Sequence, residues 1–197
     1  APAVAAEVKV SPAPRVTVAE LLRDWSLDAP KKLMALADAY EKEYGITRAE
    51  AYARIYAEAV EGKSEREERH VGIMFGPALV KEEPRIAEVM GGLPAGPLRT
   101  ACVAAVSGSG PEQEKVKAIY EAMPEGHDRS RVRNVYVTRE FRDAGAAGTI
   151  AFLDSLGTEH ERREALGWAV LGGKRARSRR EAPWRDGHAA RRPMPAA

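Results

Sequence analysis

Residues 104–125 read AAVSGSGPEQEKVKAIYEAMPE. An apolar run ends in the turn Ser107–Gly110, and Pro111 follows at the position where proline is favoured as the first residue of a helix. That second helix is expected to run through Met123, where a Met-Pro-Glu sequence closes it. The stretch therefore predicts two helices joined by a short turn, which is a helical hairpin.

The same helix signals recur along the chain. A Ser or Thr followed three residues later by Glu forms a capping box, in which each side chain bonds to the other residue's backbone N–H. Glycine just after a helical stretch indicates its end. Four such boxes open predicted helices: Thr17 with Glu20, Thr47 with Glu50, Ser64 with Glu67, and Thr158 with Glu161.

Other boundaries rest on proline, glycine and polar residues. Gly76 and Pro77 predict a break in the helix that begins after Ser64, and residues 124–130 predict a loop. The next two arms are expected to meet in a turn around Gly145–Gly148. The last helix is expected to end at Gly172–Gly173.

Successive hairpins repeat at a nearly constant period. Their second helices are expected to end at Val60, Met90, Met123 and Leu156, which are 30, 33 and 33 residues apart. A period of this length built from paired helices is typical of stacked hairpins that bury their apolar faces against each other. The fold class predicted is all-α, a short solenoid of three to four helical hairpins.

Charge divides the chain into regions. Residues 174–197 contain eight Lys or Arg and two acidic residues, whereas the whole chain has a formal net charge of only +2. We therefore predict an extended N-terminal arm (1–16), a helical-hairpin domain (17–173) and a basic, extended C-terminal tail (174–197). The Ala/Pro/Val-rich start without Met predicts that a targeting segment has been removed.

Three stretches resemble pentatricopeptide repeats: Leu36–Gly45 with the helix that follows it, Ala104–Glu125, and more weakly Phe141–Leu156. The similarity covers about residues 33–157. It implies a stack of helical hairpins and a location in mitochondria, on the matrix side. Most members of that family bind single-stranded RNA, one base per repeat.

Charge argues for a protein partner ahead of RNA. Residues 1–173 are net acidic, and a groove that follows RNA needs positive charge to neutralise phosphates. Size and architecture are also similar to the eighteen-kilodalton accessory subunits of euglenozoan mitochondrial ATP synthases. That resemblance implies a non-catalytic subunit that binds the ATP synthase α subunit. The alternative is an organellar RNA-binding protein or a ribosome-associated subunit that uses the Arg-rich tail.

Candidate partner-binding residues are aromatic or basic and lie near the chain ends. Trp184 is the best interface candidate, because the tail has no core to bury it. Trp25 and Trp168 lie on the first and last predicted helices, where each is either a cap of the stack or an anchor for a partner. The full set proposed for partner binding is Trp184, Arg175, Arg177, Arg179, Arg180 and Trp25.

No pattern predicts catalysis, a cofactor, a metal or a small-molecule substrate. Glu67 with His70 is half of a di-iron motif and has no second copy, and the segment at His160 lacks the second His of a zinc-protease helix. Cys102 lies in an apolar stretch and is expected to pack in the core. His127 and Asp128 are expected in a loop. No apolar run approaches the ~20 residues that a membrane crossing needs, so we expect no membrane insertion.

Overall fold

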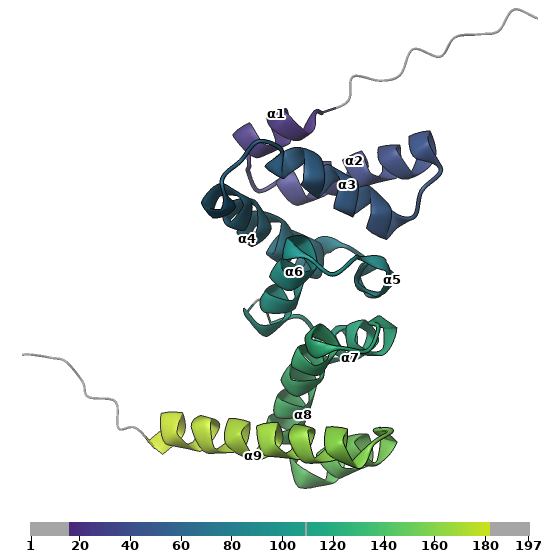
Figure 1. Ribbon diagram of the computed structural model, residues 1–197. Helices are drawn as coiled ribbons and strands as arrows, with labels where there is room; N and C mark the ends of the chain where they lie inside the picture. The colour runs from purple at the N-terminus through teal and green to yellow at the C-terminus, as the bar shows by residue number, and fades with distance from the viewer. Residues whose placement is uncertain (1–15, 109, 182–197) are drawn as a thin grey trace, which may run out of the picture. The chain divides into compact units, whose positions relative to one another are not determined.

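The computed structural model describes residues 16–108 and 110–181, and beyond residue 172 it describes the backbone only. All the regular secondary structure in these ranges is helical, and no residue in them forms a strand (Figure 1). This confirms the all-α prediction. The helices are α1 (Val18–Arg23), α2 (Ala29–Tyr44), α3 (Arg48–Val60), α4 (Glu65–Glu82), α5 (Ile86–Gly92), α6 (Pro97–Gly108), α7 (Gln113–Ala122), α8 (His127–Ser155) and α9 (Glu159–Glu181).

The chain forms two compact units, divided between Tyr136 and Val137. Unit 1 contains α1 to α7 and the first part of α8, and unit 2 contains the remainder of α8 and α9. The division falls inside α8, where the sequence has no turn signal, so it could not be placed from helix punctuation. The helical domain expected over 17–173 stays a prediction.

Capping boxes position the helix starts as predicted. Thr17, Thr47 and Ser64 each accept a hydrogen bond from the backbone N–H of the Glu three residues later, and each Glu bonds back. Thr158 and Glu161 form the same pair at the start of α9. At the other end of α2, Gly45 adopts the left-handed conformation (φ 64°) that glycine supplies without strain.

Alternate helices pack on each other in unit 1. The most extensive contact joins α4 to α6, and further contacts join α5 to α7, α3 to α5, and α2 to α4. A stack of hairpins would have these neighbours, although the solenoid itself stays a prediction. The core between the helices is filled by large, fully buried apolar side chains: Leu21, Leu33, Tyr52, Ile55, Phe75, Leu79, Ile86, Met90 and Ile119.

Helix α4 runs through Gly76 and Pro77, so the predicted break there is wrong. Pro77 is exposed and lacks an N–H, so the Ile73 carbonyl loses its helical partner at an exposed turn, where water can replace it. Gly76 serves packing instead. A Cβ on Gly76 would lie 2.6 Å from the backbone oxygen of Ala101 in α6, so the two backbones touch directly.

The same close approach recurs between α5 and α7. A Cβ on Gly91 would lie 2.8 Å from the backbone oxygen of Ala122. Glycine therefore lets both pairs of alternate helices come closer than any side chain would allow.

Three further boundaries differ from the prediction. Residues 127–130, expected in a loop, begin α8. The expected turn at Gly145–Gly148 shrinks to a kink at Gly145 (φ 70°, ψ −160°), with helix on both sides. Helix α9 continues past Gly172–Gly173 to Glu181, so residues 174–181 are helical and not extended.

In unit 2, α9 lies against the part of α8 that contains Thr138. The Thr138 hydroxyl donates to the Trp168 backbone oxygen at 3.5 Å, and a Cβ on Gly172 would overlap the Thr138 side chain. Gly172 is thus a packing residue, which explains why it does not end the helix. Val137, Leu153, Leu156, Ala165 and Ala169 are the buried apolar residues of this unit.

Gly76→Ala should destabilise unit 1, because the added methyl group meets backbone atoms that cannot rotate away. We expect a loss of about 1–3 kcal/mol, after the helix propensity gained from alanine is taken into account. The buried thiol of Cys102, next to Ala101, provides the measurement. Its labelling by a thiol reagent should accelerate about tenfold or more, since each 1.4 kcal/mol is tenfold.

Gly167→Ala is the matched control. Gly167 is also inside a helix, but nothing lies within 4 Å of a Cβ built there. We expect the substitution to leave Cys102 labelling unchanged and to stabilise α9 by up to about 1 kcal/mol. Equal labelling rates for Gly76→Ala and the unmodified chain would contradict the packing role of Gly76.

Candidate functional site

Helix α9 carries large apolar side chains that unit 2 leaves exposed. Leu166 is 48% exposed, Trp168 44%, Val170 43% and Leu171 53%. Ile150, from the second half of α8, is 56% exposed. Single exposed apolar residues are ordinary, but several within six residues of one helix are typical of a surface that another molecule covers.

The periodicity of α9 explains why these residues stay exposed. Ala165 and Ala169 are fully buried and lie one helical turn apart, so they face the core of unit 2. Leu166 and Val170 repeat at the same spacing one position later and lie beside that buried stripe. Trp168 borders the buried stripe on its other side and Leu171 lies between, so the four exposed side chains span roughly half of the helix circumference. We call Leu166, Trp168, Val170 and Leu171 the apolar face of α9.

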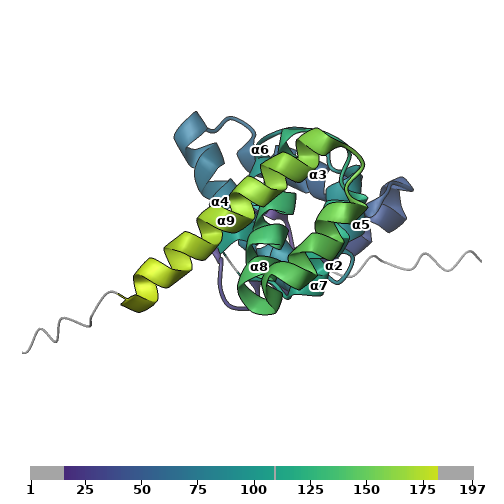
Figure 2. The same ribbon diagram turned by 90° about the horizontal axis from the view of Figure 1, so that it is seen from below.

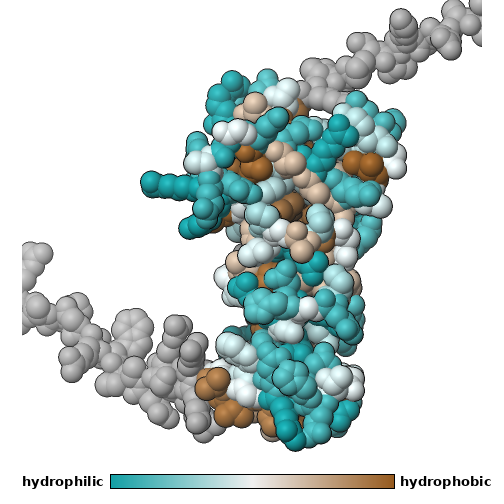
Figure 3. All heavy atoms as spheres, in the orientation of Figure 1, coloured by the Kyte–Doolittle hydropathy of each residue, from teal (hydrophilic) through white to brown (hydrophobic). Residues whose placement is uncertain are grey.

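The backbone of α9 carries this face into the basic part of the sequence. Residues 174–180 contain five Lys or Arg, and the helix includes all of them. Figures 1 and 2 show this part of α9 running beyond the end of its neighbour α8. In Figure 3, hydrophobic atoms gather on α9 just before the grey atoms begin.

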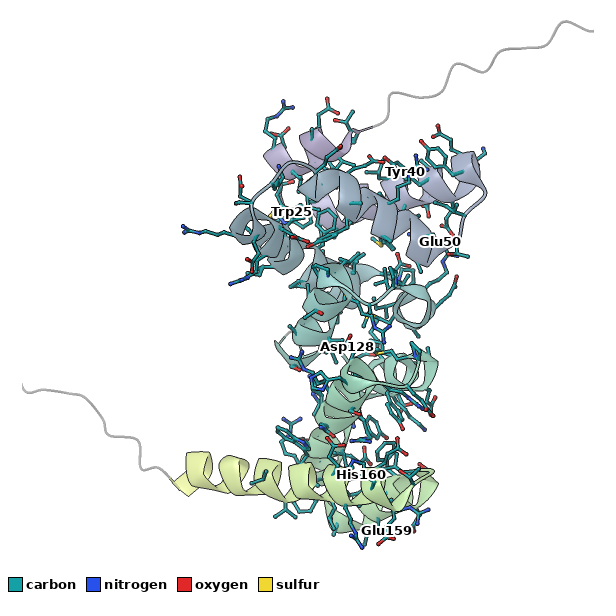
Figure 4. All side chains as sticks on the ribbon, viewed as in Figure 1. Trp25, Tyr40, Glu50, Asp128, Glu159 and His160 are labelled. Carbon is teal, nitrogen blue, oxygen red and sulfur yellow. The ribbon has the colours of Figure 1, made fainter. Side chains whose placement is uncertain are left out.

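The predicted partner-binding residues fall into three groups. Trp184 lies outside the described residues. Arg175, Arg177, Arg179 and Arg180 lie on the helical backbone of α9, and their side chains are outside the described part. Trp25 is half-buried, and its ring stacks on Phe75 of α4 with centroids 5.5 Å apart (Figure 4).

Because its ring stacks on Phe75, Trp25 has a packing role within unit 1. It packs the chain just after α1 against α4, and its role in partner binding stays a prediction. Leu166, Val170, Leu171 and Ile150 were not singled out from the sequence. Only the pairing of Leu166 with Val170 at helical spacing could have pointed to them, and that pattern also fits a buried face.

A cluster of charged side chains is buried in unit 1. Arg48 is 3% exposed and Glu83 is fully buried. The Arg48 guanidinium donates to Oε2 of Glu83 from Nε (3.1 Å) and Nη2 (2.9 Å). Its Nη1 donates to Glu41 (2.9 Å) and to Asp38. The Tyr52 hydroxyl also donates to Glu83.

The cluster binds three parts of unit 1 together. Asp38 and Glu41 come from α2, Arg48 and Tyr52 from α3, and Glu83 from the end of α4. The backbone N–H of Arg85 donates to the second oxygen of Glu83 at 2.9 Å, so both oxygens have partners. No oxygen of this carboxylate is left for a substrate.

The protonation states suit a structural role. Burial alone would raise the pKa of Glu83, but hydrogen bonds from Tyr52, Arg85 and Arg48 lower it below its usual value of 4.5. Burial and the hydrogen bond to Glu83 raise the pKa of Tyr52. Glu83 therefore stays ionised and Tyr52 protonated at neutral pH. Neither is poised to exchange a proton.

The residues weighed for catalysis lie apart or have structural partners. Glu67 and Glu161 are engaged in their capping boxes, and His160 is exposed at the start of α9 (Figure 4). Cys102 is buried, which raises the pKa of its thiol to about 12 and confirms the core prediction. Asp128 lies in the first turn of α8, with its carboxylate 3.4 Å from Nε of Arg99.

The described part of the chain contains neither a candidate metal site nor a candidate membrane-spanning helix. No three His, Cys, Asp or Glu side chains in residues 16–108 and 110–172 gather in a way that could hold a metal ion. None of the helices in these ranges combines the length and apolar character needed to cross a membrane.

Glu83→Gln should lower the free energy of unfolding by about 3 kcal/mol at neutral pH, because Arg48 then loses its buried countercharge. The loss should depend on pH. A carboxylate whose folded pKa is depressed stabilises above its unfolded pKa, here about 4.5, and that stability is lost as pH falls through the folded pKa. Urea unfolding at neutral pH and below pH 4 measures both effects.

The variant should therefore approach the unmodified chain in stability as the solution becomes acidic. Other carboxylates with lowered pKa values, such as Glu50 and Asp143, are present in both proteins and cancel in the difference. Tyr52→Phe keeps the ion pair and should cost only about 1.5 kcal/mol. A difference between Glu83→Gln and the unmodified chain that stays constant with pH would contradict this account.

Comparison of the chain with protein family models, with curated proteins and with solved structures finds no match.

Proposed function

We propose that the chain is a non-catalytic helical subunit of a larger protein assembly and that α9 is its main docking element. The apolar face of α9 supports this proposal most directly. Its four side chains are between 43% and 53% exposed on one short stretch of helix. A few residues contribute most of the binding energy of protein interfaces, and Trp is among the types enriched at those positions.

Burial of the exposed apolar area of α9 would stabilise a complex. Burying apolar surface contributes roughly 25 cal/mol per Å², so covering half of a Leu side chain stabilises a complex by about 1 kcal/mol. Several such residues together are needed to offset the entropy lost on association. The apolar face of α9 offers four within six residues.

The charge of α9 favours an acidic partner surface. Five Lys or Arg in residues 174–180 follow the apolar face on the same helix. A partner with an apolar patch flanked by carboxylates would match both features. Such charges increase the association rate and weaken in effect as salt screens them.

The partner we propose first is the α subunit of a mitochondrial ATP synthase. This choice rests on the resemblance of the chain to pentatricopeptide repeats and to accessory subunits of that enzyme, and the matrix location rests on the same resemblance. The acidic charge of residues 1–173 supports a protein partner over RNA along the hairpins.

A second candidate function is RNA binding through the basic segment. Five basic residues in seven would neutralise several phosphates. The apolar face of α9 argues against it as the main role. Of its four side chains only Trp168 could stack on a base, and the Leu and Val side chains have no partner on a nucleic acid.

The two functions separate on purification of the tagged, full-length chain from its source cells in mild detergent, with and without nuclease. We expect ATP synthase α and β subunits to co-purify, unaffected by nuclease. The double variant Leu166→Gln with Leu171→Gln should reduce their recovery about tenfold or more. Both residues are about half exposed, so the fold should tolerate the change.

Leu27→Gln is the matched control, because Leu27 is a fully exposed leucine outside α9. It should leave co-purification unchanged. Recovery of ribosomal proteins or transcripts that disappear after nuclease treatment would overturn the proposal in favour of RNA binding. Equal recovery with the double variant would show that α9 is not the docking element.

A further inference from the structure

A groove of about 830 Å³ lies between α1 and the first half of α4 in unit 1. Its floor is apolar and includes Leu22, Val71 and Met74. Its rim carries the side chains of Arg23, Lys63, Arg66, Arg69 and His70. The groove shares no lining residue with α9 or with the buried cluster around Arg48, and neither the fold nor the proposed function accounts for it.

The rim is basic where it meets solvent. Glu67 is the one carboxylate that lines the groove among the described residues, and Ser64 binds it through the capping box. Arg69 is paired with Glu65 at 2.8 Å and Arg23 with Asp24 at 3.6 Å, which compensates both charges. Arg66 has no hydrogen bond or ion pair with any described residue. Figure 3 shows hydrophilic side chains projecting from this part of the molecule, at α4.

The exposed side of α4 alternates charge with apolar surface. Arg66, His70 and Ile73 follow helical spacing along one stripe, and Ile73 is 64% exposed. The stripe is about 10 Å long, since each residue rises 1.5 Å. Glu68 is two residues from Arg66 and so lies on the other side of α4, where its backbone oxygen accepts from Tyr56.

These features fit a helix better than a compact ligand. Sites for small molecules use a few convergent polar groups inside an apolar pocket. Here the inner surface is apolar and the charges stand on long side chains at the rim. An amphipathic helix that places its apolar side on Leu22, Met74 and Ile73 would bring its flanking residues beside the rim.

The positive charge at the rim of the groove indicates which kind of helix would bind there. Carboxylates complement Arg66 and Lys63, whereas basic residues would be repelled. Neither end of this chain fits. Residues 1–15 contain one acidic and two basic residues, and residues 174–197 are strongly basic. We propose that the groove between α1 and α4 binds an acidic amphipathic helix of another protein.

The test selects helical peptides on the full-length chain. A displayed library keeps Leu at helical spacing i, i+3, i+4 and i+7 and varies the flanking positions among Glu, Lys, Gln and Ala. We expect the bound peptides to be enriched in Glu, and an enriched peptide to bind less tightly as salt rises.

Charge reversal locates the binding. Arg66→Glu should weaken an enriched peptide about tenfold or more, and it is compatible with folding, because an acidic residue is favoured in the first turn of α4. Ile73→Gln should also weaken it. Lys31→Glu, in the first turn of α2 and outside the groove, is the matched control and should change affinity less than about twofold.

A charge swap makes the assignment specific. The peptide with Lys in place of each flanking Glu should bind the unmodified chain poorly and bind the Arg66→Glu, Arg69→Glu chain better. The double variant of α9, Leu166→Gln with Leu171→Gln, should bind the Glu peptide normally, which separates this proposal from that for α9.

Four results with the peptide library and the chain alone would overturn the proposal, and a fifth concerns lipid. They are the absence of any enriched peptide, enrichment of Lys or of neutral residues, Glu-rich peptides whose affinity does not respond to Arg66→Glu, and self-association of the chain that Arg66→Glu abolishes. Binding to phosphatidylserine vesicles that depends on Arg66, without peptide enrichment, would assign the groove to anionic lipid and would also overturn it.

Discussion

The backbone contact between Gly76 of α4 and Ala101 of α6 is the constraint on which unit 1 depends. A Cβ at position 76 would lie 2.6 Å from the Ala101 oxygen, so no other residue fits without moving a helix. The contact also fixes the rotation of α4 about its axis. With Gly72 and Gly76 facing α6, Arg66 and Ile73 lie to one side of that contact, roughly a quarter turn round the helix, where they line the groove beside α1.

The buried pair of Arg48 and Glu83 works alongside this contact. It joins α2 and α3 to the junction of α4 and α5, and Tyr52 and the Arg85 N–H complete the coordination of Glu83. Each charged group of this cluster already has a partner within unit 1. The buried side chains with shifted pKa values, Glu83 and Tyr52, therefore stabilise the fold. The chemistry available to other molecules is therefore on the surface, as exposed apolar side chains next to Lys and Arg.

Local signals predicted the helix starts, and tertiary packing decided where the predictions failed. A capping box needs only residues three apart, so Thr17, Thr47 and Ser64 could be recognised in the sequence. Glycine is ambiguous, because it suits both a helix end and a close helix crossing. Gly45 ends its helix, whereas Gly76 and Gly172 allow close packing against a neighbour that the sequence does not reveal.

The same limit applies to the candidate surfaces. Trp25 and Leu166 both have the character of interface residues, but Phe75 covers the ring of one and nothing in unit 2 covers the other. Exposure is a property of the packed structure, while charge is already present in the sequence. The apolar face of α9 and the groove between α1 and α4 each combine apolar area with nearby Lys and Arg. A basic partner would therefore be repelled at either surface, whatever its shape. A chain with a net charge of only +2 can therefore present two surfaces for which we propose acidic partners.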